Sequence, residues 1–367
     1  APSASHTNMA SHRFSYASDL GWAYGEAPSE LAGSVSTYES GAGIDIFRYP
    51  GELAAGFSDT EIGGATVTDN IQDLVIASIW NGTAMSRAAF GYGSGGRFYQ
   101  IVDETTPTVS LIATVTNNRV GLEVFKDYIW YAQSTQIGRY GPINAASPTS
   151  TDAYWTGFTS TFKGQNLTHP LHEWRGKIYA GDANLLKYHD GTASATQMTL
   201  DADYVITAIN DNGPLLLIGA GQETVEDTES LVDCWLFTWD EVSAETPANT
   251  APTDKFRFPE PYIHKIMVVE GTIYCFGINY LWKLDAGVFV IVTKLDTRIA
   301  SGGADYHRGQ LYFKGSGDIR AIGSPDPQLP AARYRPYSGT GTSITALKWI
   351  QNNKLWYADN NNLYEFK

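Results

Sequence analysis

A hairpin-like unit recurs along this chain, and it constrains the fold more than any other feature of the sequence. In GKIYAGDANLLKYHDGT (176–192), a short apolar and aromatic run is followed by a turn of Gly, Asp and Asn and then by a second run. Aromatic and β-branched runs divided by such turn residues are typical of two antiparallel strands. The stretch VEGTIYCFGINYLWKLDAG (269–287) repeats the pattern most closely. We therefore interpret the hairpin as the unit of a repeat protein.

Seven copies of this unit can be placed within residues 66–367, at an average period of about 47 residues. The other five copies lie at 73–104, 125–141, 212–241, 306–323 and 350–367. Each hairpin follows one further alternating run, which is 66–72 for the first unit, and most precede another. Four short strands per repeat, with almost no helical periodicity, indicate a propeller blade. The predicted fold class is all-β: a seven-bladed β-propeller with an extended N-terminal arm.

Two other repetitive or sheet-rich folds fit the sequence less well. A β-sandwich would not give seven similar hairpins, and a parallel β-helix has much shorter repeats. Aromatic residues reach 13% and Gly contributes 36 of 367 residues, which agrees with many strands joined by tight turns.

The last unit is one strand short of a complete blade. It supplies runs at 343–350, 354–358 and 362–367, and a third strand without a neighbour would leave an open edge. The stretch GIDIFRYPGELAAGFSD (43–59) precedes the first unit and has no blade of its own. We expect part of 43–59 to pair antiparallel with 362–367 as the outer closing strand, so that the propeller spans 43–367.

One large ring recurs at a fixed place in the unit. The residues at this place are Trp130, Tyr179, Tyr274, Tyr312 and Trp356. They could form a platform on which a ligand stacks, or they could fill the wedge between neighbouring blades. We favour the second interpretation, because packed blades need a bulky side chain at a constant position and each ring buries about 150–250 Å².

Residues 1–42 break the repeat and are rich in Ala, Ser and Gly, which predicts an extended arm. The arm nevertheless carries Phe14, Tyr16, Trp22 and Tyr24, and rings left in water are unfavourable. We therefore expect these four residues to be interaction residues. They pack either on their own propeller or on a neighbouring subunit, and the sequence leaves both alternatives open.

Charge and hydropathy argue against two classes of partner. The net charge of −14, without any Lys/Arg cluster, disfavours nucleic acid. No apolar run approaches the roughly 18 residues that span a bilayer, so we expect no membrane insertion. Cys234 and Cys275 lie in apolar runs without CxxC spacing and are expected to be buried free thiols.

The sequence contains no GxSxG, HExxH, P-loop or dinucleotide motif, so we expect no catalytic residue, no metal site and no cofactor. Four histidines lie in or near the first strands, which line the channel of a propeller: His169, His172, His264 and His307. With Arg175 or Arg308 they could serve a polysaccharide lyase or hydrolase. Both arginines precede a Gly between the first and second strands, however, which favours ordinary turn chemistry.

The hairpins 176–192 and 269–287, the acidic and cysteine-poor composition and the aromatic arm resemble the β-propeller virion proteins of tailed bacteriophages, such as tail-nozzle, tail-tip and appendage proteins. The resemblance covers about residues 43–367 and carries no residue-level motif. It implies a non-enzymatic structural or interaction protein in a virion, present as a homo-oligomer. It further implies that the arm binds other structural subunits, in assembly or in attachment to a host, with a cell-surface glycan as a further candidate partner.

The alternative function is that of a secreted, extracellular propeller that binds or cleaves a glycan. Rings at the tops of the blades, such as Trp155 and Tyr92, would then stack on sugars. An intracellular scaffold of the WD type is disfavoured, because no Gly-His…Trp-Asp signature occurs. Size separates the two main hypotheses: a virion protein belongs to a large assembly, and a lectin or lyase is a small species that responds to sugar.

Overall fold

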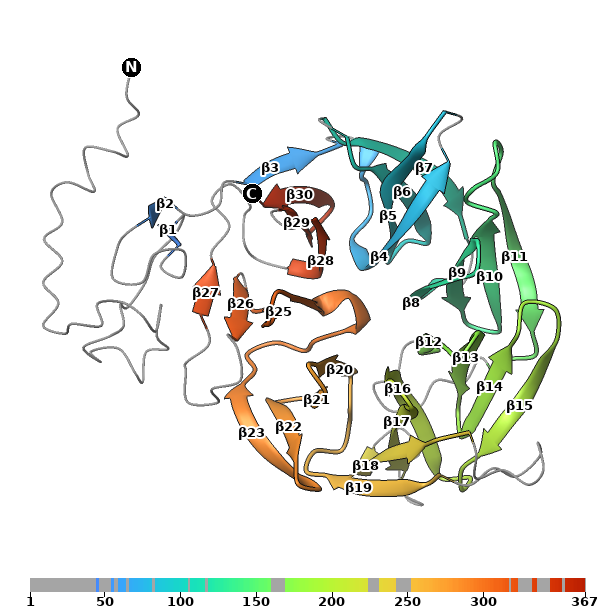
Figure 1. Ribbon diagram of the computed structural model, residues 1–367, viewed down its shortest axis with the longest axis vertical. Helices are drawn as coiled ribbons and strands as arrows, with labels where there is room; N and C mark the ends of the chain where they lie inside the picture. Colours follow the sequence, from blue (N-terminus) through green and yellow to red (C-terminus); the bar gives the residue numbers. More distant parts are fainter. Residues whose placement is uncertain are drawn as a thin grey trace, which may run out of the picture.

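The computed structural model describes residues 59–366, except 64–65, 81–82, 105, 116–117, 160–168, 224–230, 242–251, 317, 323–331, 335–343 and 352–353, together with 44–45 and 54–55. These residues form seven four-stranded antiparallel sheets arranged as a ring (Figure 1). The predicted all-β, seven-bladed β-propeller is confirmed. The arm 1–42, with its four predicted interaction residues, lies outside the described residues. Within them, no helix is long and apolar enough to cross a membrane.

In the first six blades the strands follow one another along the chain from the innermost to the outermost (Figure 1). The first three blades comprise β4 (Ile71–Trp80), β5 (Met85–Gly93), β6 (Arg97–Val102) and β7 (Thr108–Thr114); β8 (Asn118–Phe125), β9 (Tyr128–Gln133), β10 (Gln136–Gly141) and β11 (Thr149–Thr156); and β12 (Leu171–Trp174), β13 (Lys177–Asp182), β14 (Leu185–His189) and β15 (Ser194–Thr199). The next three comprise β16 (Tyr204–Asn212), β17 (Leu215–Glu223), β18 (Leu231–Trp239) and β19 (Asp254–Phe258); β20 (Lys265–Val269), β21 (Thr272–Phe276), β22 (Tyr280–Asp285) and β23 (Val288–Lys294); and β24 (Ala304–His307), β25 (Gln310–Lys314), β26 (Ile319–Ile322) and β27 (Ala332–Tyr334).

The seventh blade joins the two ends of the ring. It consists of β28 (Ile344–Gln351), β29 (Lys354–Asp359), β30 (Asn362–Phe366) and β3 (Asp59–Ile62), with β3 antiparallel to β30. The closing strand therefore lies further along the chain than expected, since only Asp59 falls within 43–59. The reason is Ile62, which is buried beside Trp356 and Leu363 in the core shared with the first blade. Upstream, β1 (Ile44–Asp45) and β2 (Ala54–Ala55) pair with each other instead.

The first unit also differs from its prediction by one strand. The run 66–72 was expected to be the innermost strand, but that strand is β4, and the hairpin of this blade is β5–β6. Asp69 in the preceding segment accepts hydrogen bonds from the backbone N–H groups of Asn70 and Gly95, at 2.9 and 2.7 Å. A side chain that caps a turn in this way holds its segment outside the ladder.

The core is divided into seven apolar clusters, and each of them joins two consecutive blades. The five recurring rings all lie in these clusters and are at most 8% exposed. Tyr179, for example, packs against Ile206 and Leu216 of the next blade. The prediction that these rings fill the wedges between blades is therefore confirmed.

Candidate functional site

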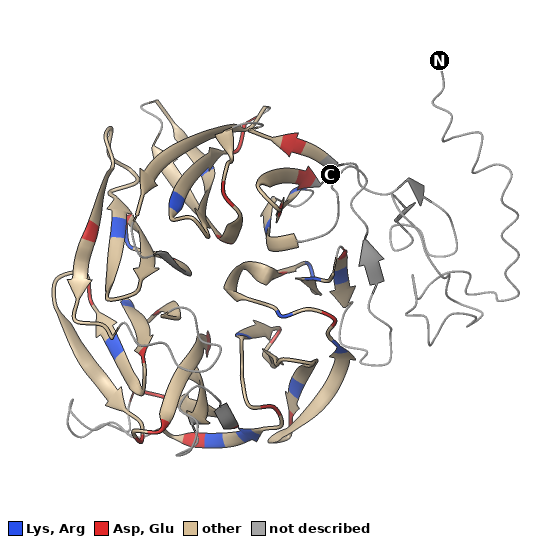
Figure 2. Cartoon of the chain, turned by 180° about the vertical axis from the view of Figure 1, so that it is seen from behind, with Lys and Arg blue, Asp and Glu red and all other residues tan. Residues whose placement is uncertain are grey.

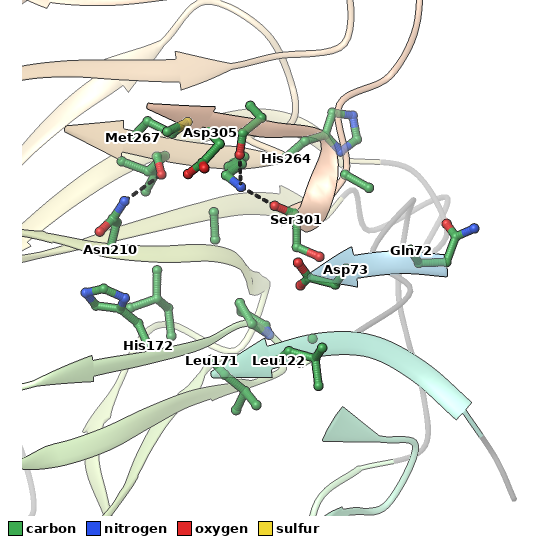
Figure 3. A pocket seen from close by; sticks show the side chains of 18 of the residues that line it. Gln72, Asp73, Leu122, Leu171, His172, Asn210, His264, Met267, Ser301 and Asp305 are labelled. Carbon is green, nitrogen blue, oxygen red and sulfur yellow. Dashed lines mark hydrogen bonds between the residues drawn. The ribbon is translucent and has the colours of Figure 1, made fainter. Parts of the chain in front are cut away.

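A cavity of about 550 Å³ occupies the centre of the ring and is lined by residues of the innermost strands of all seven blades. Figure 3 shows part of its wall. Every innermost strand contributes a polar or charged residue to its wall. In blade order these residues are Asp73, Glu123, His172, Asn210, Lys265, Asp305 and Lys348. A concave site with convergent ionisable groups is the usual place for ligand binding, so the channel is the candidate functional site.

The repeat itself places four of these charged residues. Cross-strand pairs join Glu123 to Trp130, His172 to Tyr179, Asp305 to Tyr312 and Lys348 to Trp356. In each pair, the ring is the recurring one on the second strand. Directly opposed residues project on the same face of a sheet, and the inner strand brings its residue to the channel. In these four blades, the residue of the inner strand that lies opposite the recurring aromatic side chain is therefore the one that reaches the channel.

His172 connects three neighbouring blades. Its Nε2 lies 2.7 Å from Oδ1 of Asp211 on β16, and its Nδ1 lies 3.5 Å from Oε2 of Glu123 on β8. Burial opposes protonation of the ring, but the hydrogen bonds to Asp211 and Glu123 outweigh it and raise the pKa of His172 to about 9. The hydrogen bond from His172 also lowers the pKa of Asp211. His172 is therefore a cation between two carboxylates at neutral pH.

This arrangement predicts a specific dependence of stability on pH. Because the folded-state pKa of His172 lies above its unfolded value, its contribution is complete below about pH 6.5 and is lost as the pH rises through 9. We expect the unfolding free energy of the wild type to fall by up to about 3 kcal/mol more than that of His172→Gln between pH 6.5 and pH 10. Urea unfolding of both proteins across this pH range measures the difference between their unfolding free energies. Groups that titrate equally in the two proteins cancel in this difference. Parallel curves for the two proteins would show that the ion pair contributes nothing.

The opposite wall carries two lysines and two aspartates. Lys348 Nζ lies 2.9 Å from Oδ1 of Asp305, which joins the sixth and seventh blades. Lys265 Nζ donates to the carbonyl oxygens of Ala304, at 2.8 Å, and Ser301. Burial lowers the pKa of Lys265 to about 8, although the charge of Asp73 partly offsets this effect. Burial likewise raises the pKa of Asp73.

A short 3-10 turn, η2 (Ser301–Gly303), reaches from the sixth blade to β4 of the first blade. Figure 3 shows Ser301 beside Asp73 at this point. Gly302 permits the approach, because a Cβ at this residue would lie 2.3 Å from the carbonyl oxygen of Gln72. The turn therefore packs closely against β4 and places Ser301 in the wall of the channel.

Four further residues of the channel wall lie near the start of β20 and the end of β25. His264 immediately precedes β20, and its ring lies 4.2 Å from that of Tyr262 between centroids. Arg298 Nε donates a hydrogen bond of 3.1 Å to Nδ1 of His264. Lys314 ends β25, opposite the start of β24. All four residues line the cavity.

The structure separates the four histidines that the sequence singled out. His172 and His264 line the channel. His169 instead lies with its ring nitrogens 2.8 Å from the Gly181 carbonyl oxygen and 3.1 Å from that of Ser134. The ring of His307 stacks on Trp349 at 4.3 Å. His169 and His307 thus contact neighbouring loops or rings, and neither lines the cavity.

The other described residues that the sequence analysis singled out lie in turns or in the core rather than in the channel. Arg175 and Arg308 have φ values of 50° and 49°, and each is followed by a Gly with positive φ in a two-residue hairpin loop. This geometry is a type I′ turn, as expected. The prediction that Tyr92 and Trp155 present rings to a sugar is wrong, because the two side chains are 0% and 4% exposed and pack inside the ring of blades. Cys234 and Cys275 are buried free thiols, as predicted.

Sequence reasoning found only His172 and His264 of the charged or polar residues of the channel wall discussed above and missed the others, among them Asp73, Lys265, Arg298 and Lys314. Arg298 lies in the connection between β23 and η2, and no motif surrounds it. Asp73 lies opposite Tyr92, which is on β5, the second strand of the first blade, as the recurring rings are in the other blades. The strands of this unit were misassigned from the sequence, so the pair was not recognised. A correct alignment of the first unit would have revealed Asp73. Arg298 belongs to a connection that no internal alignment covers, and Lys314 lies within the aligned unit 306–323 but at a place where the other units carry no recurring charge.

The outer rim carries a second feature, an apolar edge. Strand β23 is outermost in the fifth blade, and no strand in the described part of the chain pairs with its outer edge. Val288, Val290 and Ile291 are 65%, 46% and 50% exposed. Figure 2 shows this strand almost without charged residues, in contrast to β19 of the neighbouring blade. Long apolar edges attract further strands and are normally covered or charged.

Solved structures share the fold at low sequence identity. The WD40 β-propeller domain of Doa1 has 10% identity and a TM-score of 0.58, over 85% of this chain and 96% of that chain. A streptogramin B lyase has 10% identity and a TM-score of 0.51, over 85% and 98%. YCF48, solved bound to a D1 peptide, has 9% identity and a TM-score of 0.52, over 85% and 96%. No protein-family model matches the sequence, and no curated protein matches it.

At such identities the likeness shows the fold alone. Its structural neighbours include both a WD40 domain and a lyase, so the fold does not choose between binding and catalysis. Function therefore has to be argued from the surfaces and side chains of this chain.

Proposed function

We propose that this protein is a non-enzymatic assembly platform in the virion of a tailed bacteriophage, where identical copies bind one another and the surrounding structural subunits. The observation that carries the proposal is the exposed apolar edge of β23. An exposed strand edge on a rigid ring offers unpaired N–H and C=O groups together with a hydrophobic strip. Addition of an extended segment to such an edge supplies main-chain hydrogen bonds and side-chain contacts in one step.

The N-terminal arm of a neighbouring copy is the occupant that the sequence favours. Phe14 and Tyr16 are two residues apart, and so are Trp22 and Tyr24. In an extended chain, residues two apart project on the same face, so each pair forms an apolar strip. Val288 and Val290 are also two apart on β23 and are both exposed. An arm that pairs with this strand would cover the valines with rings.

The channel supports a binding role over a catalytic one. His172 lies between two carboxylates, and Lys348 is paired with Asp305. These pairs join neighbouring blades. The groups that could act as general acids or bases are therefore engaged in contacts that hold the blades together. Host attachment through the exposed face of such a ring is consistent with this arrangement.

The assembly proposal is tested by the molar mass of the full-length protein in solution. We expect the wild type to form a closed oligomer by sedimentation equilibrium, since arms that bind neighbours in head-to-tail order produce a ring when the rotation between copies closes. Val290→Asp places a charge on the edge and should give monomers, and deletion of residues 1–42 should do the same while sparing the fold. The thermal unfolding of each variant reports the fold.

Leu111→Asp is the matched control, because Leu111 is 48% exposed on β7, the outer strand of another blade. It should leave the oligomer intact. A monomeric wild type, or an oligomer that survives Val290→Asp, would contradict the proposal. A protein that stays small and binds a polysaccharide would instead support the secreted, extracellular glycan-binding alternative.

A further inference from the structure

One hydrogen-bond donor in the channel wall, Nε2 of His264, has no acceptor. Nδ1 of His264 accepts from Arg298 Nε at 3.1 Å, so in the neutral ring the proton is on Nε2. Burial, with added repulsion from Arg298 and Lys314, lowers the pKa of His264 to about 2, which keeps the ring neutral. The side chain is 8% exposed, and Nε2 is buried and has no hydrogen-bond partner. An unused donor of this kind is unfavourable unless a ligand supplies the acceptor.

Two cations lie beside this donor. Burial lowers the pKa of Arg298 and that of Lys314, and the charge of Arg298 lowers the pKa of Lys314 further. Across the described residues, Lys314 forms no ion pair with a carboxylate. Like charges that are partly buried together repel each other, and an anion between them would remove the repulsion.

The three groups are held in place by the fold. The backbone N–H group of His264 donates a hydrogen bond of 2.8 Å to the carbonyl oxygen of Phe276, and the imidazole ring packs on Tyr262. The stem of Lys314 crosses Gly303, where a Cβ would lie 3.3 Å from Cδ and Cε of the lysine. Since Ala304 pairs with Phe313, the end of β25 lies at the same end of the channel as the start of β24. The donors are therefore preorganised before any ligand arrives.

We propose that His264, Arg298 and Lys314 form a binding site for an oxyanion, either the carboxylate or the phosphate group of a ligand that enters the channel. The imidazole Nε2–H of His264 and the ammonium group of Lys314 are donors, and the guanidinium group of Arg298 adds a positive charge beside them. A ligand group that only accepts hydrogen bonds and carries negative charge suits this combination. Two of the channel carboxylates already have cationic partners, since Asp305 is paired with Lys348 and Glu123 with His172. The site goes beyond the assembly function and does not depend on β23.

The test uses the full-length protein in a chloride-free buffer, with inorganic phosphate and acetate as separate probes. We expect saturable binding by calorimetry and a shift of the His264 Nε2 resonance in imidazole ¹H–¹⁵N spectra. Lys314→Gln should weaken the binding at least about tenfold, which corresponds to about 1.4 kcal/mol. Preference for phosphate identifies a phosphate site, and preference for acetate identifies a carboxylate site.

Lys283→Gln is the matched control. Lys283 lies on β22 of the blade that contributes His264, is paired with Asp285 at 3.4 Å and does not line the channel. This variant should bind as the wild type does. His264→Phe keeps a ring but removes the donor, and it should also weaken the binding. The inference is overturned if neither probe shifts the His264 resonance, or if Lys314→Gln and Lys283→Gln bind equally well. Repeating the titration on Val290→Asp separates the anion site from assembly.

Discussion

Deletion of residues 362–367 is expected to abolish folding, although it removes only a terminus. Strand β30 pairs with β29 on one side and with β3 on the other, so its loss leaves β3 without a partner. Leu363 is fully buried in the core that the last blade shares with the first. The deletion therefore opens the ring and exposes one complete interface between blades. Since a typical net stability is only about 5–15 kcal/mol, we expect the loss of a whole interface between blades to be enough to unfold the protein.

The measurement is thermal unfolding followed by near-UV circular dichroism, together with the soluble yield. Leu363→Ala is the milder variant, for which we expect a loss of about 2–5 kcal/mol with the fold retained. Deletion of residues 1–42 is the control at the other terminus and should keep a cooperative transition. If the protein without 362–367 unfolds cooperatively near the wild-type midpoint, then the closure of the ring by β3 and β30 is wrong.

Trp356→Ala should be the most destabilising single substitution of a recurring ring, with a loss of about 3–5 kcal/mol. Trp356 is fully buried between the last and first blades, beside Ile62 and Leu74. Its Nε1 also donates 3.0 Å to Oε2 of Glu365, a side chain that is only 2% exposed. The substitution therefore creates a cavity and also removes a donor from a buried carboxylate, which adds to the loss.

Trp80→Ala provides a control with the same change of residue. Trp80 ends β4 and is 39% exposed, so its removal should change the unfolding free energy by less than about 1 kcal/mol. Trp356→Phe keeps most of the apolar volume and loses the donor, which separates the two contributions. Urea unfolding measures all three variants. Equal effects of Trp356→Ala and Trp80→Ala would show that the ring is not a wedge between blades.

The blades could be recognised from sequence because their central hairpins are local. Turns such as Arg175-Gly176 fix the register of two neighbouring strands, and the recurring ring marks the second of them. The prediction erred where this local signal is weak. The first unit has a ten-residue inner strand, β4, that resembles the second strand of the other units. The closing strand β3 has only four residues, and its one buried apolar residue, Ile62, gives too weak a pattern to be recognised in the sequence.

The channel was harder to predict than the blades, since its wall comes from seven separate segments. Glu123, His172 and Asp211 are distant in sequence, and only closure of the ring brings them within contact. Sequence position alone did not separate His172 from His307, which lies at the end of its inner strand and stacks on Trp349. Arg298 and Lys314 could be linked to ligand binding only once the fold was known, because it places their charges near His264, whose Nε2 has no hydrogen-bond partner.

A cryo-EM map of the native particle tests the central claim, which is that the ring is an assembly platform. We predict density for the seven-bladed ring in repeated copies, with the N-terminal arm of each copy added as a strand to β23 of its neighbour. Rings that are absent from the particle, or arms that pack entirely on their own propeller and leave β23 uncovered, would contradict the account.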